Sequence, residues 1–454
     1  MTTPSPDPGR VHHAGGAKFG SRLGFILATA GSAVGLGNIW RFPFVVGENG
    51  GGAFLLPYLI AVAAIGVPAM VVELAAGRGS GRGVVGTFAA LPRRATWLGL
   101  LVVVASLAVL SYYLVVTGWA LGYLLFGLAG RHPGFSVFTA GANSVWFFLA
   151  SAGITALIVS LGVNRGIEAC SKVLMPVLLG LMLGLALYGL TLPGRDEALQ
   201  FSLAPRPSAL ADATVWVRAL GQAFFSVGVG MGVLITYGAY VPRRTNLVGS
   251  SALIAAADTG IALLAGLVVF PIAFSFGSTP GSGPQLAFDT LPKAFESFRP
   301  AVGYTVAVLF YLALTVAALT SAVSLFETVA VGLHDARGSS RRRSVPLILA
   351  VLVLLGLPSA FSYTGLKWQL FGLPVLDVMD TAVGTFGLPV GVLVTAAVLS
   401  WKGAAVVGRG LDSRAWSGKL IVWTVRWVVP PAIAILLGAM LLELLRHRML
   451  PQGG

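Results

Sequence analysis

The stretch ATAGSAVGLGNIWRFP, residues 28–43, begins as an apolar helix and is interrupted in its middle. Gly31, Gly35 and Gly37 lie close together, and the polar residues Asn38 and Arg41 follow. Glycine lowers helix stability by about 1 kcal/mol and permits backbone conformations that other residues avoid. In a membrane, non-helical backbone is tolerated only where it is buried in protein or lines a watery cavity. Small residues also let helices pack closely, but the polar pair favours a broken membrane helix that faces a binding site.

The composition excludes a soluble protein. The chain has 454 residues, of which 56% are hydrophobic and 10% charged, and its mean hydropathy is +0.87. A soluble domain carries about 25% charged residues, so the chain is predicted to be a polytopic membrane protein. Its single cysteine, Cys170, excludes an internal disulfide framework. Residues 1–20 are rich in Pro, Gly and His and are expected to form a disordered cytoplasmic tail, without a cleaved signal peptide.

Long apolar segments recur along the chain, and a spanning helix needs about 20 such residues. They predict eleven membrane helices, at residues 21–45, 53–77, 96–127, 144–161, 167–190, 214–240, 251–275, 300–333, 345–361, 373–401 and 420–445. Most basic residues then fall in segments on the side of the N-terminus, which predicts a cytoplasmic N-terminus and a C-terminus outside. The net charge of +14 is therefore interpreted as topology and contact with the lipid bilayer, not as a nucleic-acid footprint.

The sixth predicted helix contains a second glycine-rich interruption, like that of the first. Its segment QAFFSVGVGMG, residues 222–232, places glycine at the alternate positions 228, 230 and 232. Close helix packing is again the structural alternative. Paired interruptions at corresponding positions of two halves are, however, typical of a transporter binding site.

Several polar residues lie deep in the apolar helices. Asp258 is in mid-helix, where a carboxylate costs about 2.5 kcal/mol or more unless a partner offsets it. Thr320 and Ser321 could bond to their own helix, and Glu73 could be a helix-end charge. Tyr113, in a Tyr-Tyr pair, could be ordinary packing. Together with free carbonyls these groups are hard oxygen ligands suited to an alkali cation, and no cluster of His or Cys indicates a transition-metal site.

The motifs GSAVGLGNIWRFP (31–43) and ENGGGAF (48–54) resemble the signature of the neurotransmitter:sodium symporter family, especially its bacterial amino-acid members. Further similar segments cover nearly the whole chain, at residues 112–113, 164–168, 222–232, 235–240, 286–292, 319–321 and 376–380. The resemblance implies the all-α leucine-transporter fold, with helices 1 and 6 unwound in mid-membrane. It implies two inverted five-helix repeats, at 21–190 and 214–401, and an additional eleventh helix at 420–445. The family usually has twelve helices, so a dimer contact through a twelfth is unsupported and the oligomeric state stays open.

The resemblance also implies two sodium sites. The first would use the carbonyl of Ala33, the side chains of Asn38, Ser226 and Asp258, and the carboxylate of the substrate. The second would use the carbonyls of Gly31, Val34 and Ala317 and the hydroxyls of Thr320 and Ser321.

Asp258 departs from the family pattern, which commonly has Asn at this position. Animal members hold a chloride ion beside this sodium, near the positions of Tyr58, Gln222 and Ser226. A fixed carboxylate at Asp258 would supply that negative charge, so transport is expected to be independent of chloride.

The amino-acid substrate would bind at the first break. Its carboxylate would meet the amides of Leu36 and Gly37 and the hydroxyl of Tyr113, and its amino group would meet carbonyls at Ala33, Phe225 and Ser226. Monoamine transporters carry Asp at the position of Gly35, so this glycine implies an α-amino acid. The side-chain pocket would consist of Val109, Tyr113, Phe225, Gly228, Met231, Ser321 and Leu325. Because it holds no charge, a hydrophobic or aromatic side chain is expected.

Two gates complete the implied site. The outer gate would pair Arg41 with Asp380 above the substrate. The inner gate of the family pairs an N-terminal arginine with the residue at Asp335, beside Tyr240. That arginine position falls on Gly16 here, so Lys18 or Arg22 is a possible substitute, and a plugging tryptophan becomes Phe19. A looser inner gate is expected.

The resemblance implies sodium-coupled import of an L-amino acid by alternating access across a bacterial plasma membrane. One alternative is a proton-coupled permease of the same fold, in which the buried carboxylate of Asp258 carries the proton. A second is a non-transporting receptor or a channel. An enzyme is disfavoured because no nucleophile–base pair is apparent. The identity of the amino acid and the sodium stoichiometry stay open.

Overall fold

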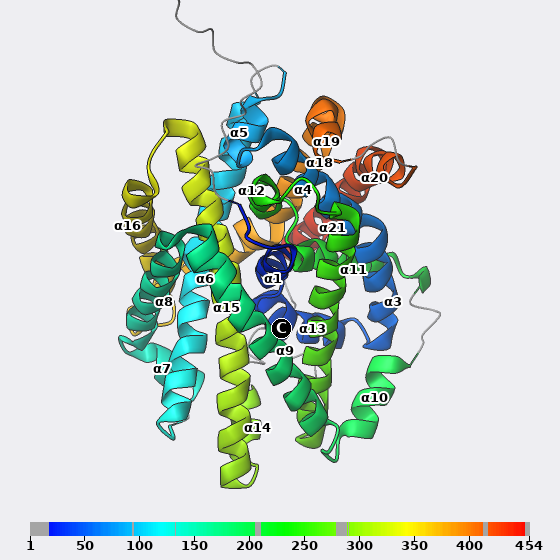
Figure 1. The fold of residues 1–454 in the computed structure, drawn as a ribbon. Helices are drawn as coiled ribbons and strands as arrows, with labels where there is room; N and C mark the ends of the chain where they lie inside the picture. Colours follow the sequence, from blue (N-terminus) through cyan, green and yellow to red (C-terminus); the bar gives the residue numbers. More distant parts are fainter. Residues whose placement is uncertain are drawn as a thin grey trace, which may run out of the picture.

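The computed structural model describes residues 18–92, 95–131, 133–204, 210–277, 288, 290–411 and 416–449. Residues 1–17 of the predicted tail, and Gly16 with them, lie outside these ranges. The described chain is almost wholly helical, as predicted (Figure 1). One two-stranded antiparallel sheet joins β1 (Gln369–Leu370) and β2 (Leu373–Pro374), with Leu370 opposite Leu373.

The first half of the chain forms the first five predicted spans, and η marks a π-helical segment in the labels. Its helices are α1 (Arg22–Ala33), η2 (Gly37–Arg41), α2 (Phe42–Glu48), α3 (Gly52–Ala61), η3 (Val62–Gly66), α4 (Val67–Ser80), α5 (Val84–Ala89), α6 (Thr96–Leu128), α7 (Phe135–Ala140), α8 (Asn143–Ser160), η4 (Val163–Glu168), α9 (Ala169–Gly189) and α10 (Arg195–Leu203). The segment η3 continues α3 into α4, and η4 begins the helix that α9 completes.

The second half forms the remaining spans. Its helices are α11 (Ala213–Val227), α12 (Val233–Tyr240), α13 (Leu247–Ser275), α14 (Thr290–Glu296), α15 (Pro300–Arg337), α16 (Arg341–Ala360), α17 (Val375–Met379), η7 (Asp380–Gly387), α18 (Leu388–Ala397), η8 (Val398–Lys402), α19 (Ala404–Gly410), α20 (Trp416–Trp427) and α21 (Val429–Met449).

All eleven predicted spans have helical counterparts. Within the described residues, nine helices are long and apolar enough to cross a membrane, and α1 with η2 and α2 makes a tenth that is bent by 50°. The sixth predicted span, 214–240, is divided into α11 and α12 by residues 228–232. The two interrupted helices are therefore the two that the glycine pattern singled out.

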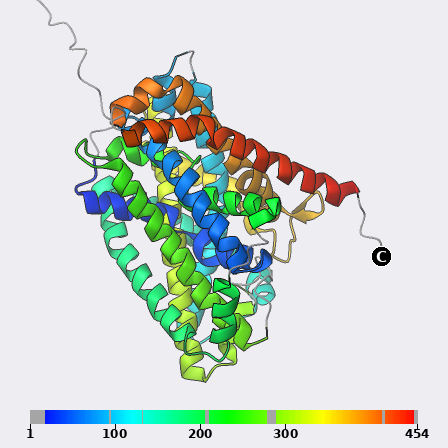
Figure 2. The same ribbon diagram turned by 90° about the vertical axis from the view of Figure 1, so that its right-hand side faces the viewer.

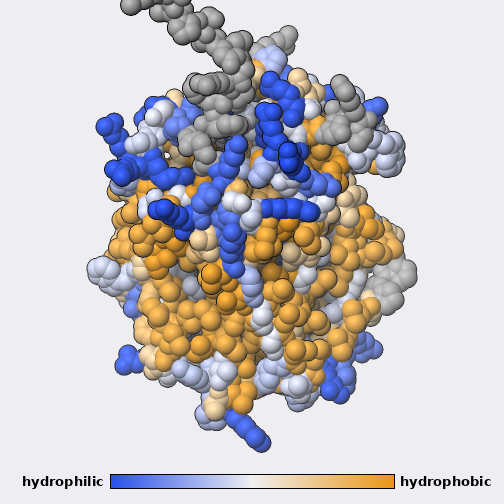
Figure 3. Space-filling view, viewed as in Figure 1, coloured by the Kyte–Doolittle hydropathy of each residue, from blue (hydrophilic) through white to orange (hydrophobic). Residues whose placement is uncertain are grey.

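The surface suits a bilayer. Figure 3 shows an apolar area over the middle of one face, with hydrophilic residues gathered toward its two ends. Many large apolar side chains on the outer helices are exposed, among them Leu100, Val104, Leu183 and Leu354. Large exposed apolar areas of this kind mark contact with protein or membrane.

The centre of the molecule is α1, which is packed against α9, α13 and α15 (Figure 1). The break between α11 and α12 lies beside it. There Gly228, Gly230 and Gly232 have φ angles of 67°, 86° and 73°, which side-chain-bearing residues rarely adopt. The buried Glu73 of α4 accepts a 2.9 Å hydrogen bond from the Gly230 amide. Glu73 is therefore a support for the broken helix and not an exposed helix-end charge.

Candidate transport site

The first helix is unwound where the sequence predicted it. α1 ends at Ala33, Val34 is extended with φ −70° and ψ 108°, and η2 begins at Gly37. The amide of Gly35 donates to Asn38 Oδ1 over 3.1 Å, and the amide of Leu36 donates to the Tyr113 hydroxyl over 3.2 Å. The break thus turns backbone groups away from the helix axis toward polar side chains of α6 and η2.

The residues predicted for the second sodium site meet between α1 and α15. Ser321 Oγ donates to the carbonyls of Gly31 and Val34 over 3.3 and 3.1 Å. Thr320 Oγ1 donates to the carbonyl of Ala317 over 3.0 Å, so Thr320 bonds to its own helix as the structural alternative expected. Ser321 instead reaches across to the broken helix. These carbonyl and hydroxyl oxygens are hard ligands of the kind that alkali cations prefer.

The three side chains predicted for the first sodium site also meet. Asp258 of α13 is wholly buried, and its Oδ1 and Oδ2 accept from Asn38 Nδ2 over 2.7 Å and from Ser226 Oγ over 2.5 Å. The Tyr58 hydroxyl donates to Ser226 Oγ over 3.2 Å, and Gln222 Nε2 donates to the carbonyl of Gly37 over 3.3 Å. A carboxylate therefore occupies the middle of a cluster of neutral donors drawn from helices far apart in the sequence.

A cavity opens beside both clusters. Of the residues predicted to bind substrate it is lined by Ala33, Leu36, Gly37, Val109, Tyr113, Phe225, Gly228, Met231, Ser321 and Leu325, while Ser226 belongs to the Asp258 cluster behind it. Sequence reasoning assigned no role in the side-chain pocket to the further lining residues Ser32, Trp40, Phe44, Tyr112, Val116, Val233 and Leu388. No motif of α18 marks Leu388, so only the tertiary structure identifies it.

Two glycines shape the cavity. A Cβ atom on Gly35 would lie 2.6 Å from Ser321 Oγ and 2.8 Å from the Tyr113 hydroxyl, so a side chain here would displace both groups. A Cβ atom on Gly228 would meet no heavy atom within 4 Å. Gly35 therefore permits close approach of α1 to α6 and α15, whereas the region beside Gly228 has room for a bulky group.

The outer gate residues face this cavity but do not form an ion pair in this structure. Arg41 places its guanidinium over the ring of Phe225, 4.4 Å from the ring centre. Asp380 lies near the hydroxyl of Tyr112, since a Cβ atom on Gly384 would be 2.8 Å from Asp380 Oδ1 and 2.5 Å from that hydroxyl. Both gate residues line the cavity, so the predicted pair is brought to the same space without being joined.

The opposite end of α1 is closed by aromatic packing. Phe19 is buried against Phe25, Tyr237 and Tyr240, with ring centres 5.5 to 6.0 Å apart. Its amide donates to the carbonyl of Tyr240 over 3.1 Å. Phe19 is therefore buried between α1 and α12 on the side of the N-terminus, at the position where a plugging side chain was expected.

The structure does not bring Lys18 or Arg22 to Asp335. Within the described chain neither forms an ion pair with it, and Asp335 Oδ2 instead accepts from the Gly86 amide of α5 over 3.0 Å. The start of the described chain is held by Glu168 of η4, which accepts from the Gly20 amide over 2.6 Å and from Ser21 Oγ over 3.1 Å.

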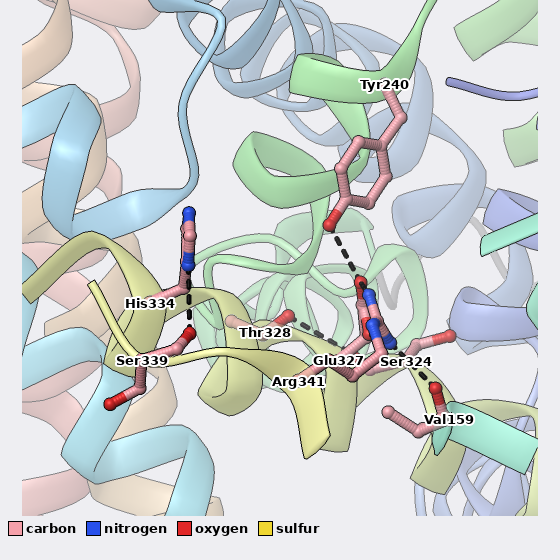
Figure 4. Close-up of polar contacts among 8 residues, drawn as sticks. All are labelled: Val159, Tyr240, Ser324, Glu327, Thr328, His334, Ser339 and Arg341. Atoms are coloured by element: carbon pink, nitrogen blue, oxygen red, sulfur yellow. Dashed lines mark hydrogen bonds and ion pairs between the residues drawn. The ribbon is translucent and has the colours of Figure 1, made fainter. Parts of the chain in front are cut away.

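Sequence reasoning missed the buried carboxylate of Glu327, which lies near Tyr240. Figure 4 shows Glu327 of α15 between Tyr240 and Arg341. Nη1 and Nη2 of Arg341 each donate to a carboxylate oxygen of Glu327 over 2.6 Å. The Tyr240 hydroxyl donates to Glu327 over 2.7 Å, and Arg341 Nη1 also donates to the carbonyl of Val159 over 2.7 Å. The sequence signal that could have found Glu327 is the one used for Asp258: a carboxylate within an apolar helix requires a partner.

Comparison with known proteins agrees with this geometry. Residues 17–137 and 135–448 match the model of the sodium:neurotransmitter symporter family. The sodium-dependent transporter YhdH of Bacillus subtilis is 35% identical over 440 residues, covering 92% of this chain and 96% of its own. The sodium-dependent transporter MJ1319 of Methanocaldococcus jannaschii is 35% identical over 412 residues, covering 84% and 81%.

Among solved structures, the crystal structure of MhsT in complex with L-phenylalanine matches with a TM-score of 0.83 and 38% identity, covering 92% of this chain and 98% of that chain. This match confirms the predicted leucine-transporter fold. With its sequence, its broken helices and its relatives in agreement, the chain belongs to the sodium:neurotransmitter symporter family and is a sodium-dependent membrane transporter.

Proposed function

We propose that this transporter imports an L-α-amino acid with a hydrophobic or aromatic side chain, coupled to sodium and without chloride. The observation that carries the proposal is the cavity at the break of α1, which is polar where the backbone is unwound and apolar at its other end. A zwitterionic head group and an apolar side chain match these two ends.

The polar end suits a carboxylate. η2 begins at Gly37, so the amides of Leu36 and Gly37 lie at the start of a helical segment, where backbone N–H groups and the helix dipole favour an anion. The Tyr113 hydroxyl lies beside the Leu36 amide, 3.2 Å away. Gly35 brings no acidic group to this end, so the site offers no substitute for the carboxylate that an amine substrate would lack.

The apolar end suits a bulky uncharged side chain. It is formed by Val109, Met231 and Leu325, with the open space beside Gly228. Methionine is flexible and accommodates ligands of different shape. The similarity to MhsT, whose structure holds L-phenylalanine, supports an aromatic substrate.

Sodium and substrate would stabilise one another. A cation at the cluster of Asn38, Ser226 and Asp258 would neutralise both the buried carboxylate and the substrate carboxylate, so each ligand raises the affinity of the other by the same factor. The carboxylate of Asp258 supplies the negative charge that chloride would otherwise provide. Inward movement of each positive charge gains about 2.3 kcal/mol per 100 mV of membrane potential.

Transport would proceed by alternating closure. In the present structure Phe19 packs against Tyr240 on the side of the N-terminus, while Arg41 and Asp380 flank the cavity unpaired. Pairing of Arg41 with Asp380 would cover the substrate, and release of Phe19 from Tyr240 would open the other side. With a cytoplasmic N-terminus in a bacterial plasma membrane, this sequence of events is import.

The test is uptake of the twenty L-amino acids, one at a time, into proteoliposomes that contain the purified protein. An inward sodium gradient is expected to drive accumulation of leucine, phenylalanine, tyrosine or tryptophan and not of aspartate or lysine. Replacing sodium by choline at fixed pH should abolish it. Accumulation driven by a pH gradient in choline would favour the proton-coupled alternative, and no accumulation of any amino acid would contradict the proposal.

A further inference from the structure

The region where the chain leaves the tenth span and returns through the eleventh is rich in exposed tryptophan and in basic residues. Trp401, Trp423 and Trp427 are each more than half exposed. The region 398–427 contains the five basic residues Lys402, Arg409, Arg414, Lys419 and Arg426 and one acidic residue, Asp412; Asp412 and Arg414 lie outside the described residues. None of the described carboxylates forms an ion pair with Lys402, Arg409, Lys419 or Arg426.

Helix α20 begins the eleventh span beside the end of the tenth. α20 (12 residues) is continued by α21 (21 residues), and residues 416–442 form one apolar helix long enough to cross a membrane. Figure 2 shows the two following one another in one direction. The ring of Trp427, at the end of α20, lies 6.1 Å from that of Trp401, which ends the tenth predicted span. This part of α20 therefore lies beside the end of the tenth span, and Lys419, Trp423 and Arg426 precede Trp427 toward the start of the eleventh.

The basic and aromatic residues of α20 share one face. Lys419, Trp423, Arg426 and Trp427 are spaced by four, three and one residues, so they follow a single stripe of the helix. Trp is enriched at membrane interfaces, and Lys and Arg near the ends of membrane helices extend their charged groups toward the interface. In Figure 1 this helix lies beside α19 at the same end of the molecule.

A pocket lies between that stripe and α19. It is lined by Ala404 and Gly408 of α19 and by Lys419, Val422, Trp423, Arg426 and Trp427 of α20. Nε and Nη2 of Arg426 donate to the carbonyl of Ser400, over 3.0 Å from Nε, which fixes the guanidinium without neutralising its charge. The small residues of α19 leave the space open, and the two basic side chains make it positive.

We propose that this pocket binds the phosphate head group of an anionic phospholipid of the cytoplasmic leaflet. Lys419 and the fixed guanidinium of Arg426 would contact the phosphate, since basic pockets between helices on this side of a membrane bind anionic head groups. Trp423 and Trp427 would lie against the glycerol and upper acyl chains, where amphipathic rings are favoured. The site is separate from the transport cavity and does not rest on the proposed substrate.

Native mass spectrometry of the full-length protein with short-chain phosphatidylglycerol or phosphatidylcholine tests the assignment. The wild type is expected to retain phosphatidylglycerol more strongly than phosphatidylcholine. Lys419→Gln should weaken phosphatidylglycerol retention about fivefold, the effect of one basic residue near an anionic surface, and leave phosphatidylcholine unchanged. Arg426→Gln should weaken it at least as much.

The matched control is Arg244→Gln, which removes an exposed basic residue between α12 and α13. It should retain phosphatidylglycerol like the wild type. The proposal is overturned if Lys419→Gln, eluting as a folded monodisperse protein, retains this lipid as well as the control does. Equal retention of the two lipids by the wild type would also overturn it, as would displacement of the lipid by millimolar inorganic phosphate, because the acyl chains would then contribute nothing.

Discussion

Substituting alanine for Gly35 tests whether the substrate and sodium bind beside Ser321 and Tyr113 at the broken first helix. The added Cβ would lie 2.6 Å from Ser321 Oγ and 2.8 Å from the Tyr113 hydroxyl, both below the 3.0 Å that such contacts tolerate. Ser321 bonds to the carbonyls of Gly31 and Val34, and Tyr113 accepts from the Leu36 amide. One methyl group therefore disturbs a predicted sodium site and a predicted carboxylate contact together.

The size of the effect follows from overpacking, which costs about 1–3 kcal/mol in a well-packed site. Because the displaced groups, Ser321 Oγ and the Tyr113 hydroxyl, are those proposed to meet sodium and the substrate carboxylate, we expect the Kd for the best substrate of the uptake screen to rise about 5-fold to 150-fold. Equilibrium binding of the labelled amino acid in saturating sodium measures it. Half-saturating sodium should rise as well, since Ser321 is displaced.

The matched control is Gly180→Ala in α9, where a Cβ would meet no heavy atom within 4 Å. It should change the Kd by less than twofold. If Gly35→Ala bound the substrate as tightly as the wild type while both variants remained folded, the placement of substrate beside Ser321 and Tyr113 would be wrong.

Three further predictions concern the charged residues. Asp258→Asn keeps the side-chain shape but removes the negative charge between Asn38 and Ser226, so the half-saturating sodium concentration should rise about tenfold or more. Chloride should then stimulate uptake by this variant, and equal uptake in chloride and gluconate would refute this. Glu327→Gln leaves the guanidinium of Arg341 without its carboxylate, which should cost about 3–5 kcal/mol of unfolding free energy; thermal unfolding measures the loss, and the double variant Glu327→Gln, Arg341→Gln should recover part of it. Asp335→Ala should lower uptake less than Arg41→Ala does, because Asp335 contacts the Gly86 amide and pairs with neither Lys18 nor Arg22; the opposite order in an uptake assay would mean that Asp335 is the principal latch.

The breaks of the first and sixth helices could be predicted from the sequence because glycine acts locally. Residues 31–37 and 228–232 lie in otherwise apolar helices, and each interruption appears where the glycines are. The burial of Asp258 followed from its position in an apolar run, since no exposed surface was available to it. Its neighbours Asn38 and Ser226 were placed beside it by resemblance to the family and not by any local pattern.

The contacts that close the inner side could not be predicted in the same way. Glu168 and Gly20 are 148 residues apart in the sequence, and their hydrogen bond depends on how η4 packs beside the start of α1. Arg341 was interpreted as one of the basic residues that set topology, but it points back into the protein and bonds to Glu327. Lys18 was a reasonable candidate by charge alone, yet the carboxylate it was assigned to is already bound to the Gly86 amide.

The eleventh span was predicted as a whole, but the position of its basic residues was not. Hydropathy predicted one span at 420–445, and the structure has α20 (Trp416–Trp427) continued by α21 (Val429–Met449), with residues 416–442 forming one apolar helix long enough to cross a membrane. A hydropathy window averages over the basic residues Lys419 and Arg426, so it does not place them relative to neighbouring helices. The contact of Trp427 with Trp401 shows that this part of α20 lies beside the end of the tenth span.

The central claim is that sodium alone drives amino-acid accumulation through the cluster around Asp258. The most direct test is uptake of phenylalanine into wild-type proteoliposomes under an inward sodium gradient, with chloride on both sides and then with gluconate in its place. Equal accumulation in the two anions, and none when choline replaces sodium, is the expected result. Accumulation that collapses in gluconate, or that persists in choline, would contradict the claim.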